Sequence, residues 1–499
     1  MFVTGCRSRL AHVKPALSLL ALLLSGCALA PSDSKDVTLP KAATAPQTLT
    51  ADYPKAPKGL SPAPVPAQWW SLFNDPTLTA LESRALKRNL SLKTAAAKVA
   101  QSQAQLGLTR SDKMPHLGAY AGYSRSALSG NDPLERIGAS SKAHDTWRLG
   151  LQASWELDLW GYLDHLEDAA KSQLAASIYG QDAVRLSLSA QVANSYLLLR
   201  GAQQQLAVAE QQSQVSQQLL ALTESRHRNG VATDSDIDDA KAALASVKAQ
   251  LPPLKQRCKE LKSALALLLD LAPGELDSTL ASSGETLLPL PSQLPVGVPS
   301  ELARRRPDIL IAEAKLHAAV AKVGAAHADF YPRISLTGDI GTQSFELHNL
   351  KSWESRQFSI GPTLYLPIFE GGRLRRNLAL SQASEQIAAL NYQQTVLGAW
   401  HEVDNALSAI DNSKQSHQQL ANAYLHQQQA LKATRFAEQQ GAADKVAVLR
   451  ERQKLLGSQA ALNDATTASA LSVVSLYRAL GSGWPAQSNK LTAKGGSHE

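Results

Sequence analysis

Apolar and polar residues alternate strictly between Trp147 and Leu159. Every odd-numbered position in this stretch is apolar, and every even-numbered position is polar or glycine. Because successive side chains of a β-strand point to opposite faces, this period of two predicts a strand at 147–159 with one apolar face and one polar face. The charged members of the polar face are Arg148, Glu156 and Asp158.

Three further segments alternate in the same way, at about 115–128, 332–345 and 356–369, and the first of them does so least clearly. In the second, Ile334 and Ile340 oppose a polar set that includes Asp339. One such segment is common in soluble sheets, but four of them predict a distinct β part. Asp339 therefore joins the charged residues expected on a wet face of the strands.

Two long windows of the chain, 162–251 and 368–484, contain no proline. Since proline breaks helix interiors, its absence over such lengths predicts long helices. Each window is interrupted by a glycine suited to a helix C-terminus, Gly230 in the first and Gly441 in the second. We therefore expect helices at about 162–229, 234–269, 373–440 and 444–481. The first would span on the order of 100 Å.

These helices are rich in Ala, Gln, Ser and Leu, which favours antiparallel coiled-coil pairs with a solvated side. Shorter helical patterns run from about 77 to 112 and from 301 to 328. The pattern as a whole predicts a mainly α fold with a small β part.

Two pairs of segments match at a common offset of 211 residues. "WELDLWG" (155–161) matches "LPIFEGG" (366–372), and "RNGVATDSDIDDAKAAL" (228–244) matches "QQGAADKVAVLRERQKL" (439–455). The chain is therefore predicted to hold two tandem copies of one unit, 69–270 and 301–484, joined by a linker at 271–300. The change from strand to helix falls at Trp160, Gly161, Gly371 and Gly372.

The N-terminus has the features of a secretory signal. Three basic residues precede the apolar run 16–24, which is too short to span a bilayer. "LSGC" then resembles a bacterial lipobox, which implies cleavage of residues 1–26 and a lipid on Cys27. An ordinary signal peptide with an unmodified cysteine is the alternative. Ala28 and Leu29, in place of an aspartate, point to the outer membrane.

The next segment, 27–68, carries eight prolines and predicts an extended tether; residues 485–499 are expected to form a disordered tail. The net charge is +7, and removal of residues 1–26 leaves +4, which does not suggest nucleic-acid binding. Only Cys258 then remains besides Cys27, so no disulfide framework is expected.

Catalytic and metal chemistry find little support in the sequence. It contains neither a glycine-rich phosphate loop nor a His-Glu-x-x-His motif, and its 12 histidines are scattered. Met114 is the only methionine beyond the signal, which disfavours copper transport along methionines. We therefore expect a protein that is not an enzyme and carries no cofactor other than the lipid on Cys27.

Assembly follows from the number of strands. Four strands cannot close a barrel, and open edges are not tolerated in lipid. If the strands lie in a membrane, several chains must combine them. Two chains would give eight strands with a filled interior, and three would give twelve around a water-lined pore.

Several motifs together carry a family resemblance that covers the chain from Trp69 to Trp484. They are "WWSLFNDPTLTAL", "ASWELDLWG", "VPSELARRRPDILIAEAKLHAA", "DFYPRISLTGDIG", "LPIFEGGRLR", "AWHEVDNAL" and "YRALGSGW". The chain resembles the TolC-like lipoproteins of the NodT group, the outer-membrane factors of tripartite efflux pumps. The resemblance implies a homotrimer with one 12-stranded β-barrel and a periplasmic α-helical tunnel. It also implies a periplasmic adaptor, an inner-membrane pump of the resistance-nodulation-division type, and passive export of drugs or other toxic compounds.

In that family the helix reversals form the periplasmic tip, which closes the tunnel and meets the adaptor. The resemblance places this tip at Gly230 and Gly441. Gate candidates are the nearby carboxylates and their basic partners: Asp234, Asp236, Asp238, Asp239 and Asp444, with Arg226, Arg228 and Arg435. Asp444 is the first candidate because family gates lie on the second reversal, although "DKVAVLRER" departs from the family pattern there. Acidic residues also favour helix N-termini without any gating role.

Two alternatives to a drug channel remain at this point. One is a lipid-anchored periplasmic coiled-coil scaffold without a pore, and the other is a channel of the same family serving metal or protein export. The charged face with Arg148, Glu156, Asp158 and Asp339 favours a wet lumen over a dry scaffold core.

Overall fold

The computed structural model describes residues 60–61, 63–134, 137–138, 140–281, 290–297 and 305–483. The predicted signal peptide, Cys27, most of the tether and the C-terminal tail lie outside these residues. The described chain divides into two compact units. The strand unit comes from residues 100–175 and 313–390, and the helical unit comes from the remaining described residues. Each unit draws on both predicted repeats, so the tandem division stays a prediction.

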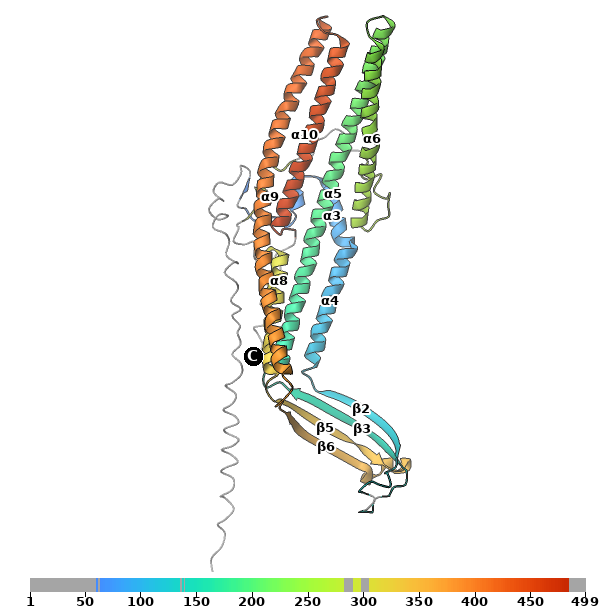
Figure 1. Ribbon diagram of the computed structural model, residues 1–499, viewed down its shortest axis with the longest axis vertical. Coiled ribbons are helices and arrows are strands. Elements are labelled where there is room, and N and C mark those ends of the chain that lie inside the picture. The colour runs from blue at the N-terminus through green and yellow to red at the C-terminus, as the bar shows by residue number, and fades with distance from the viewer. Residues whose placement is uncertain are drawn as a thin grey trace, which may run out of the picture. The chain divides into compact units, whose positions relative to one another are not determined.

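The strand unit contains one antiparallel sheet in the order β2-β3-β5-β6 (Figure 1). Its strands are β2 (His116–Ser126), β3 (His144–Leu157), β5 (Arg333–Ser344) and β6 (Arg356–Tyr365). Two short 3-10 turns, η7 (Leu347–Lys351) and η8 (Trp353–Ser355), connect β5 to β6. The two outer strands, β2 and β6, form the edges of the sheet.

The register of the sheet gathers the apolar positions of all four strands on one face. One apolar row runs from Ala119 through Leu151 and Ile340 to Phe358. The next rows on the same face contribute further exposed side chains, and Leu149, Leu151, Ile340, Phe358 and Ile360 are between 45% and 81% exposed. The alternation that predicts each strand thus becomes one apolar face on the assembled sheet.

The strand ends differ from the predicted ones for local reasons. β3 begins three residues earlier than expected, because His144 still pairs with Ser126. β3 stops at Leu157, so Asp158, predicted as a strand residue, lies beyond the strand. β6 stops at Tyr365 rather than 369, shortly before Pro367, which has no N–H to donate to a ladder.

Four long helices follow the strands in two pairs. They are α5 (Tyr162–Arg228), α6 (Asp234–Leu268), α9 (Arg373–Gln439) and α10 (Lys445–Ala479). Figure 1 shows α6 lying beside α5 and α10 beside α9. α6 continues through the exposed Pro252 and Pro253. Among the residues that the structure describes, no helix has both the length and the apolar character needed to cross a membrane.

The expected helix at 77–112 is wrong as a single element, because it is divided at Asn89. α3 (Pro76–Arg88) ends there, and α4 (Leu90–Ser111) begins. The backbone of Asn89 turns to ψ 131°, its Oδ1 accepts from the Leu92 N–H, and its Nδ2 donates to the Leu268 carbonyl. A side chain that bonds the backbone on both sides competes with a continuous helix. The expected helix at 301–328 is α8 (Pro307–Ala328).

The core of the helical unit lies between α5 and α10. Val208 and Val215 pack against Leu449 and Leu456, all 4% exposed or less. Further along, Gly201 lets the helices approach closely, since an added methyl group there would lie 2.4 Å from the Thr467 hydroxyl oxygen.

The helical unit also contains a short 3-10 helix, η4 (Trp69–Phe73), and a parallel strand pair, β1 (Leu60–Ser61) and β4 (Leu294–Pro295). Trp69 stacks on Tyr477 with ring centroids 5.6 Å apart. Arg306, 6% exposed, donates to the Ala479 carbonyl at 2.9 Å and to the Glu402 carboxylate at 2.7 Å. One buried guanidinium therefore joins the segment before α8 to α9 and α10.

Candidate functional site

The polar face of the sheet contains three of the four predicted charged residues. Arg148 and Glu156 lie on β3, and Asp339 lies on β5 opposite Gln152. The Glu156 carboxylate is 3.9 Å from Arg333 Nε, which makes a weak ion pair between the two strands. Asp158 does not share this face, because its carboxylate accepts a hydrogen bond from the Asp164 backbone N–H at 2.8 Å, in the first turn of α5. Its role is therefore at the helix start.

The predicted strand-to-helix residues lie where each strand gives way to a helix. Gly161, Gly371 and Gly372 adopt positive φ of 76°, 59° and 86°, which glycine tolerates without a steric penalty. Trp160 stacks on Tyr331 with centroids 5.1 Å apart and donates from Nε1 to the Pro332 carbonyl at 2.7 Å. The turn after β3 is thus fixed against the start of β5.

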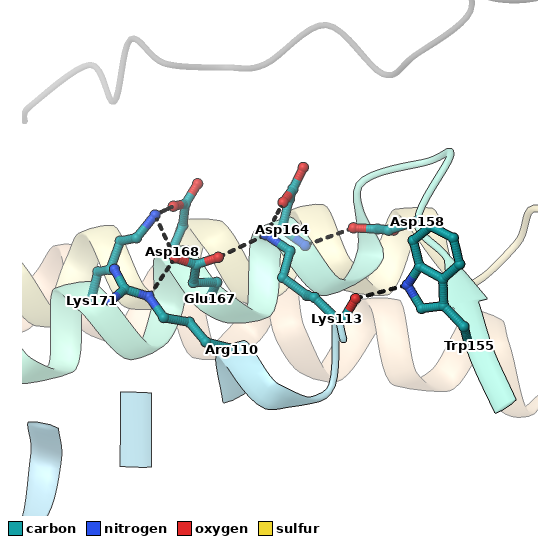
Figure 2. A network of polar contacts seen from close by, with 8 residues as sticks. All are labelled: Arg110, Lys113, Trp155, Asp158, Asp164, Glu167, Asp168 and Lys171. Atoms are coloured by element: carbon teal, nitrogen blue, oxygen red, sulfur yellow. Dashed lines mark hydrogen bonds and ion pairs between the residues drawn. The ribbon is translucent and has the colours of Figure 1, made fainter. Parts of the chain in front are cut away.

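A network of charged residues fastens the start of α5 to the segment that enters β2 (Figure 2). Lys113 donates to a carboxylate oxygen of Glu167 at 2.7 Å and to the Asp164 carboxylate. The other Glu167 oxygen accepts from Arg110 Nε at 3.0 Å and lies 3.1 Å from Lys171 Nζ. We call these five residues, together with Asp168, the junction network.

The junction network is tied to the strands through the backbone. The carbonyl of Lys113 accepts from Trp155 Nε1 at 2.9 Å, and Trp155 lies on β3. Figure 2 shows Trp155 and Asp158 on one side of this network and Lys171 on the other. The ends of α4 and β3 and the start of α5 are therefore held together by side chains within the strand unit.

Glu167 is the most enclosed carboxylate of the network, with its side chain 12% exposed. Burial acts to raise its pKa, but the hydrogen bonds from Lys113, Arg110 and Lys171 outweigh burial and lower the pKa to about 2. Burial likewise opposes the charge of Lys113, yet its bonds to Asp164 and Glu167 raise its pKa overall. Both groups are charged at neutral pH, and their charges compensate each other.

The first helix reversal is a capped turn. Gly230 has φ 72°, and the N–H of Val231 donates to the Arg226 carbonyl at 2.8 Å, which closes the end of α5. Thr233 and Asp236 then form a reciprocal capping box at the start of α6. Hydrogen bonds from the backbone and side chain of Thr233 lower the pKa of Asp236.

The remaining carboxylates of the first reversal, Asp234, Asp238 and Asp239, are exposed. Asp234 lies 3.0 Å from His227 Nε2, and Asp238 lies 3.6 Å from Lys241 Nζ. Asp236, in contrast, stabilises the start of α6 through its capping box, which is the role that the alternative to gating expects. A gating role for Asp236 is still a prediction.

The second reversal repeats this arrangement with Gly441 at φ 74°. Asp444 caps α10 by accepting from the Ala447 N–H at 2.8 Å, and its second oxygen lies 3.4 Å from Arg226 Nη1. The structure therefore joins the two reversals through an exposed ion pair between Arg226 and Asp444. Both side chains are solvated, at 42% and 61% exposed, so this pair contributes little to stability.

Arg435 lies apart from that pair. It lines a groove of about 540 Å³ on α9 and α10 with Gln428, Leu431, Lys432, Phe436, Gln439 and Leu455. Within the described part of the chain, Arg435 makes no ion pair with the carboxylates of the tip. The predicted partnership of Arg435 with the tip carboxylates stays a prediction.

Neither the junction network nor the buried Arg306 was expected from the sequence. Glu167 and Lys171 stand four residues apart, a spacing that predicts a pair on one helix face, but Lys113 and Arg110 are brought in only by the fold. Among the described residues, no three His, Cys, Asp or Glu side chains are grouped closely enough to hold a metal ion. Cys258 is buried and unpaired, and burial raises the pKa of its thiol.

Comparison with known proteins adds a family and several relatives. A family model described as "Outer membrane efflux protein" matches residues 81–270 and 298–482. Outer membrane protein OprJ of Pseudomonas aeruginosa is 34% identical over 502 residues, which cover 97% of this chain and 99% of OprJ. Cation efflux system protein CusC of Escherichia coli K12 is 32% identical over 469 residues, which cover 93% of this chain and 98% of CusC. The structure of the Campylobacter jejuni CmeC outer membrane channel superposes with a TM-score of 0.81 at 25% identity, covering 92% of this chain and 97% of that one.

Proposed function

Because this chain belongs to the outer membrane efflux protein family, we propose that three copies of it form the exit duct of a tripartite efflux system. As a member of that family, the chain is an outer-membrane channel component of an efflux system. The trimer and its partners are the proposed part. The partners would be a periplasmic adaptor and an inner-membrane pump of the resistance-nodulation-division type.

The observation that carries the proposal is the two-faced sheet. Its apolar face exposes large side chains, among them Phe358 at 81%, which an isolated protomer leaves in water at considerable cost. Its polar face carries Arg148 and Asp339. A closed sheet of three copies would pair the edge strands β2 and β6, turn the apolar face to lipid and enclose the polar face around water. A scaffold without a pore offers no partner for the apolar face.

We propose small toxic organic compounds as the solutes. The relatives' names include both a general outer membrane protein, OprJ, and a cation efflux protein, CusC. A metal route would call for soft ligands along the path, and the described residues contain no cluster of three metal-binding side chains. The duct is passive in this proposal, and the pump supplies the energy.

The tip is proposed to meet the adaptor. The reversals at Gly230 and Gly441 are the ends of the helix pairs, and the Arg226–Asp444 pair links them within one protomer. Since that pair is exposed, an approaching adaptor can exchange it for contacts of its own. Asp444 remains our candidate gate residue at this tip.

Reconstitution of the full-length protein tests the proposal. We expect a trimer by native mass in detergent, and discrete conductance steps in planar bilayers. Crosslinking in cells should recover an adaptor and a pump with the protein. A monomer that produces no conductance would refute the duct and leave the scaffold.

The lipid anchor is tested separately. The proposed lipid on Cys27 predicts a mass increase over the cleaved chain, and Cys27→Ala should abolish it. An unmodified Cys27 in the mature protein would leave the alternative of an ordinary signal peptide.

A further inference from the structure

Tyr120 differs from every other residue of β2 in its surroundings. It is the one position of that strand that is partly buried, while the other ten are exposed. The register places it in a row across the whole sheet, opposite Gly150 of β3, Gly341 of β5 and Gln357 of β6. This row lies on the polar face, between the rows that contain Arg148 and Asp339.

Gly150 makes room for the tyrosine ring, and Gly341 lies beside its hydroxyl. A methyl group added to Gly150 would lie 2.6 Å from the Tyr120 hydroxyl oxygen. One added to Gly341 would lie 3.2 Å from that oxygen and 2.6 Å from the Leu149 carbonyl oxygen. Neither glycine has a positive φ, so neither is needed for its backbone conformation. Glycine within a strand commonly marks a close approach by another group, and here that group is a side chain lying flat across the sheet.

The tyrosine hydroxyl reaches the far side of the sheet. Lying over Gly150 and beside Gly341, the hydroxyl is close enough to interact with Asp339 on β5, with Gln357 on β6 and, electrostatically, with Arg148. We call Tyr120, Gly150, Gly341, Asp339 and Gln357 the tyrosine bridge. Asp339 is partly covered there, whereas Arg148 is exposed.

Asp339 and Arg148, the two charged residues of this region, therefore differ in how easily a solute can reach them. The Asp339 carboxylate lies near the Tyr120 hydroxyl and is partly covered, which shields its charge from solutes. The Arg148 guanidinium makes no ion pair within the described residues and stands free on the same face. Of the remaining nearby charges, Arg333 lies 2.7 Å from the Asp329 carboxylate and 3.9 Å from that of Glu156, so both of its acidic neighbours share one guanidinium.

We propose that the tyrosine bridge determines the charge selectivity of the duct, by restraining the Asp339 carboxylate and leaving Arg148 as the charge that passing solutes meet. This inference rests on the proposed function, because it requires the polar face to line a lumen. In a trimer the arrangement occurs three times around one pore. The strand region then favours anionic and neutral solutes over cationic ones, as a ring of free guanidinium groups does.

Tyr120→Phe tests the bridge without changing any formal charge. The full-length protein is reconstituted in planar bilayers, and the permeability ratio of K⁺ to Cl⁻ is obtained from the reversal potential in a KCl gradient. Freed from the hydroxyl, the Asp339 carboxylate attracts cations, so we expect this ratio to rise by about twofold. Arg148→Gln should raise it as well.

Tyr123→Phe is the matched control. Tyr123 lies on the same strand but on the opposite face, where it packs on Trp147 and donates to Asp145 at 3.0 Å. Its loss of a hydroxyl should leave the ratio unchanged. Asp339→Asn supplies the second control, because Tyr120→Phe should have no further effect in that background.

The results of these measurements distinguish failure of the proposed duct from failure of the proposed tyrosine bridge. A wild-type protein that does not conduct refutes the duct itself. A wild-type protein that conducts, with a ratio unaltered by Tyr120→Phe or altered equally in the Asp339→Asn background, refutes only the bridge. Gly150→Ala is a weaker probe, since the added methyl group would also lie 2.9 Å from the Ile340 carbonyl oxygen and can prevent assembly.

Discussion

Glu167 offers the sharpest test of how the strand unit is held together. Its carboxylate accepts from three basic side chains and is largely enclosed. Glu167→Gln keeps the size and one acceptor oxygen but removes the charge. Lys113 would retain Asp164, while Arg110 and Lys171 would lose their shared partner. We expect the variant to fold and to be less stable at neutral pH.

The expected loss of stability in Glu167→Gln follows from the pKa of Glu167. The folded value of about 2 lies below the ordinary value of 4.5. Each tenfold change in proton affinity corresponds to about 1.4 kcal/mol, so ionised Glu167 stabilises the fold by about 3 kcal/mol. With an unfolding entropy of about 1 kcal/mol/K for a chain of this length, the variant should melt roughly 3 °C lower at pH 7.

The pH dependence has a defined direction. Because the folded pKa is depressed, the stabilisation is fully present above the ordinary value of 4.5 and is lost as the pH falls toward 2. At pH 3 about half of it should remain. The difference in melting temperature between wild type and Glu167→Gln should therefore shrink from pH 7 to pH 3.

Thermal loss of helical circular dichroism in detergent, at a fixed scan rate, measures this difference. Asp168→Asn is the matched control. The Asp168 side chain is 60% exposed and, of the other members of the junction network, it pairs only with Lys171. The melting temperature of this variant should lie within about 1 °C of wild type. A Glu167→Gln variant that melts like wild type at pH 7, or whose deficit stays constant down to pH 3, would contradict the role assigned to the junction network.

Three further outcomes are expected. Gly201→Val should lower the melting temperature by several degrees, because its side chain would overlap the Thr467 hydroxyl, and Gly201→Ala should have a smaller effect of the same sign. Trp160→Phe removes the hydrogen bond to the Pro332 carbonyl and should cost about 1 kcal/mol in a melting experiment; no change would mean that ring packing alone fixes the turn. Asp444→Asn can still cap α10 and loses only its charge, so melting should be unaffected while the resting single-channel conductance rises; an unchanged conductance would assign Asp444 to capping alone.

Much of the fold could be predicted from local pattern. The alternation at 147–159 places Leu151 and its neighbours on one face, and the structure has the strand β3 there. A glycine within a long helical pattern predicts a helix end, because glycine readily adopts the positive φ that follows a helix. The structure has such glycines at Gly230 and Gly441, just beyond the ends of α5 and α9. The break at Asn89 was not predicted, since it depends on a hydrogen bond to Leu268, 179 residues away.

The candidate site was predictable only in part. Arg148 and Asp339 follow from the period of two within their own strands, but their proximity to Tyr120 depends on how three strands are aligned. The alternation treats Gly150 as a polar-face residue and does not show that it makes room for a ring.

The sequence by itself determined where the four sheet strands and the four long helices lie and which face of each strand is wet, because a period of two or an uninterrupted helical run needs only neighbouring residues. The break at Asn89 and the ends of the strands were not determined in this way. The tertiary structure alone decided which wet residues meet. Register set the row from Tyr120 to Gln357, and the approach of α4 to α5 brought Lys113 to Glu167. Such pairings depend on segments far apart in the chain, and their geometry is fixed by packing rather than by any local pattern.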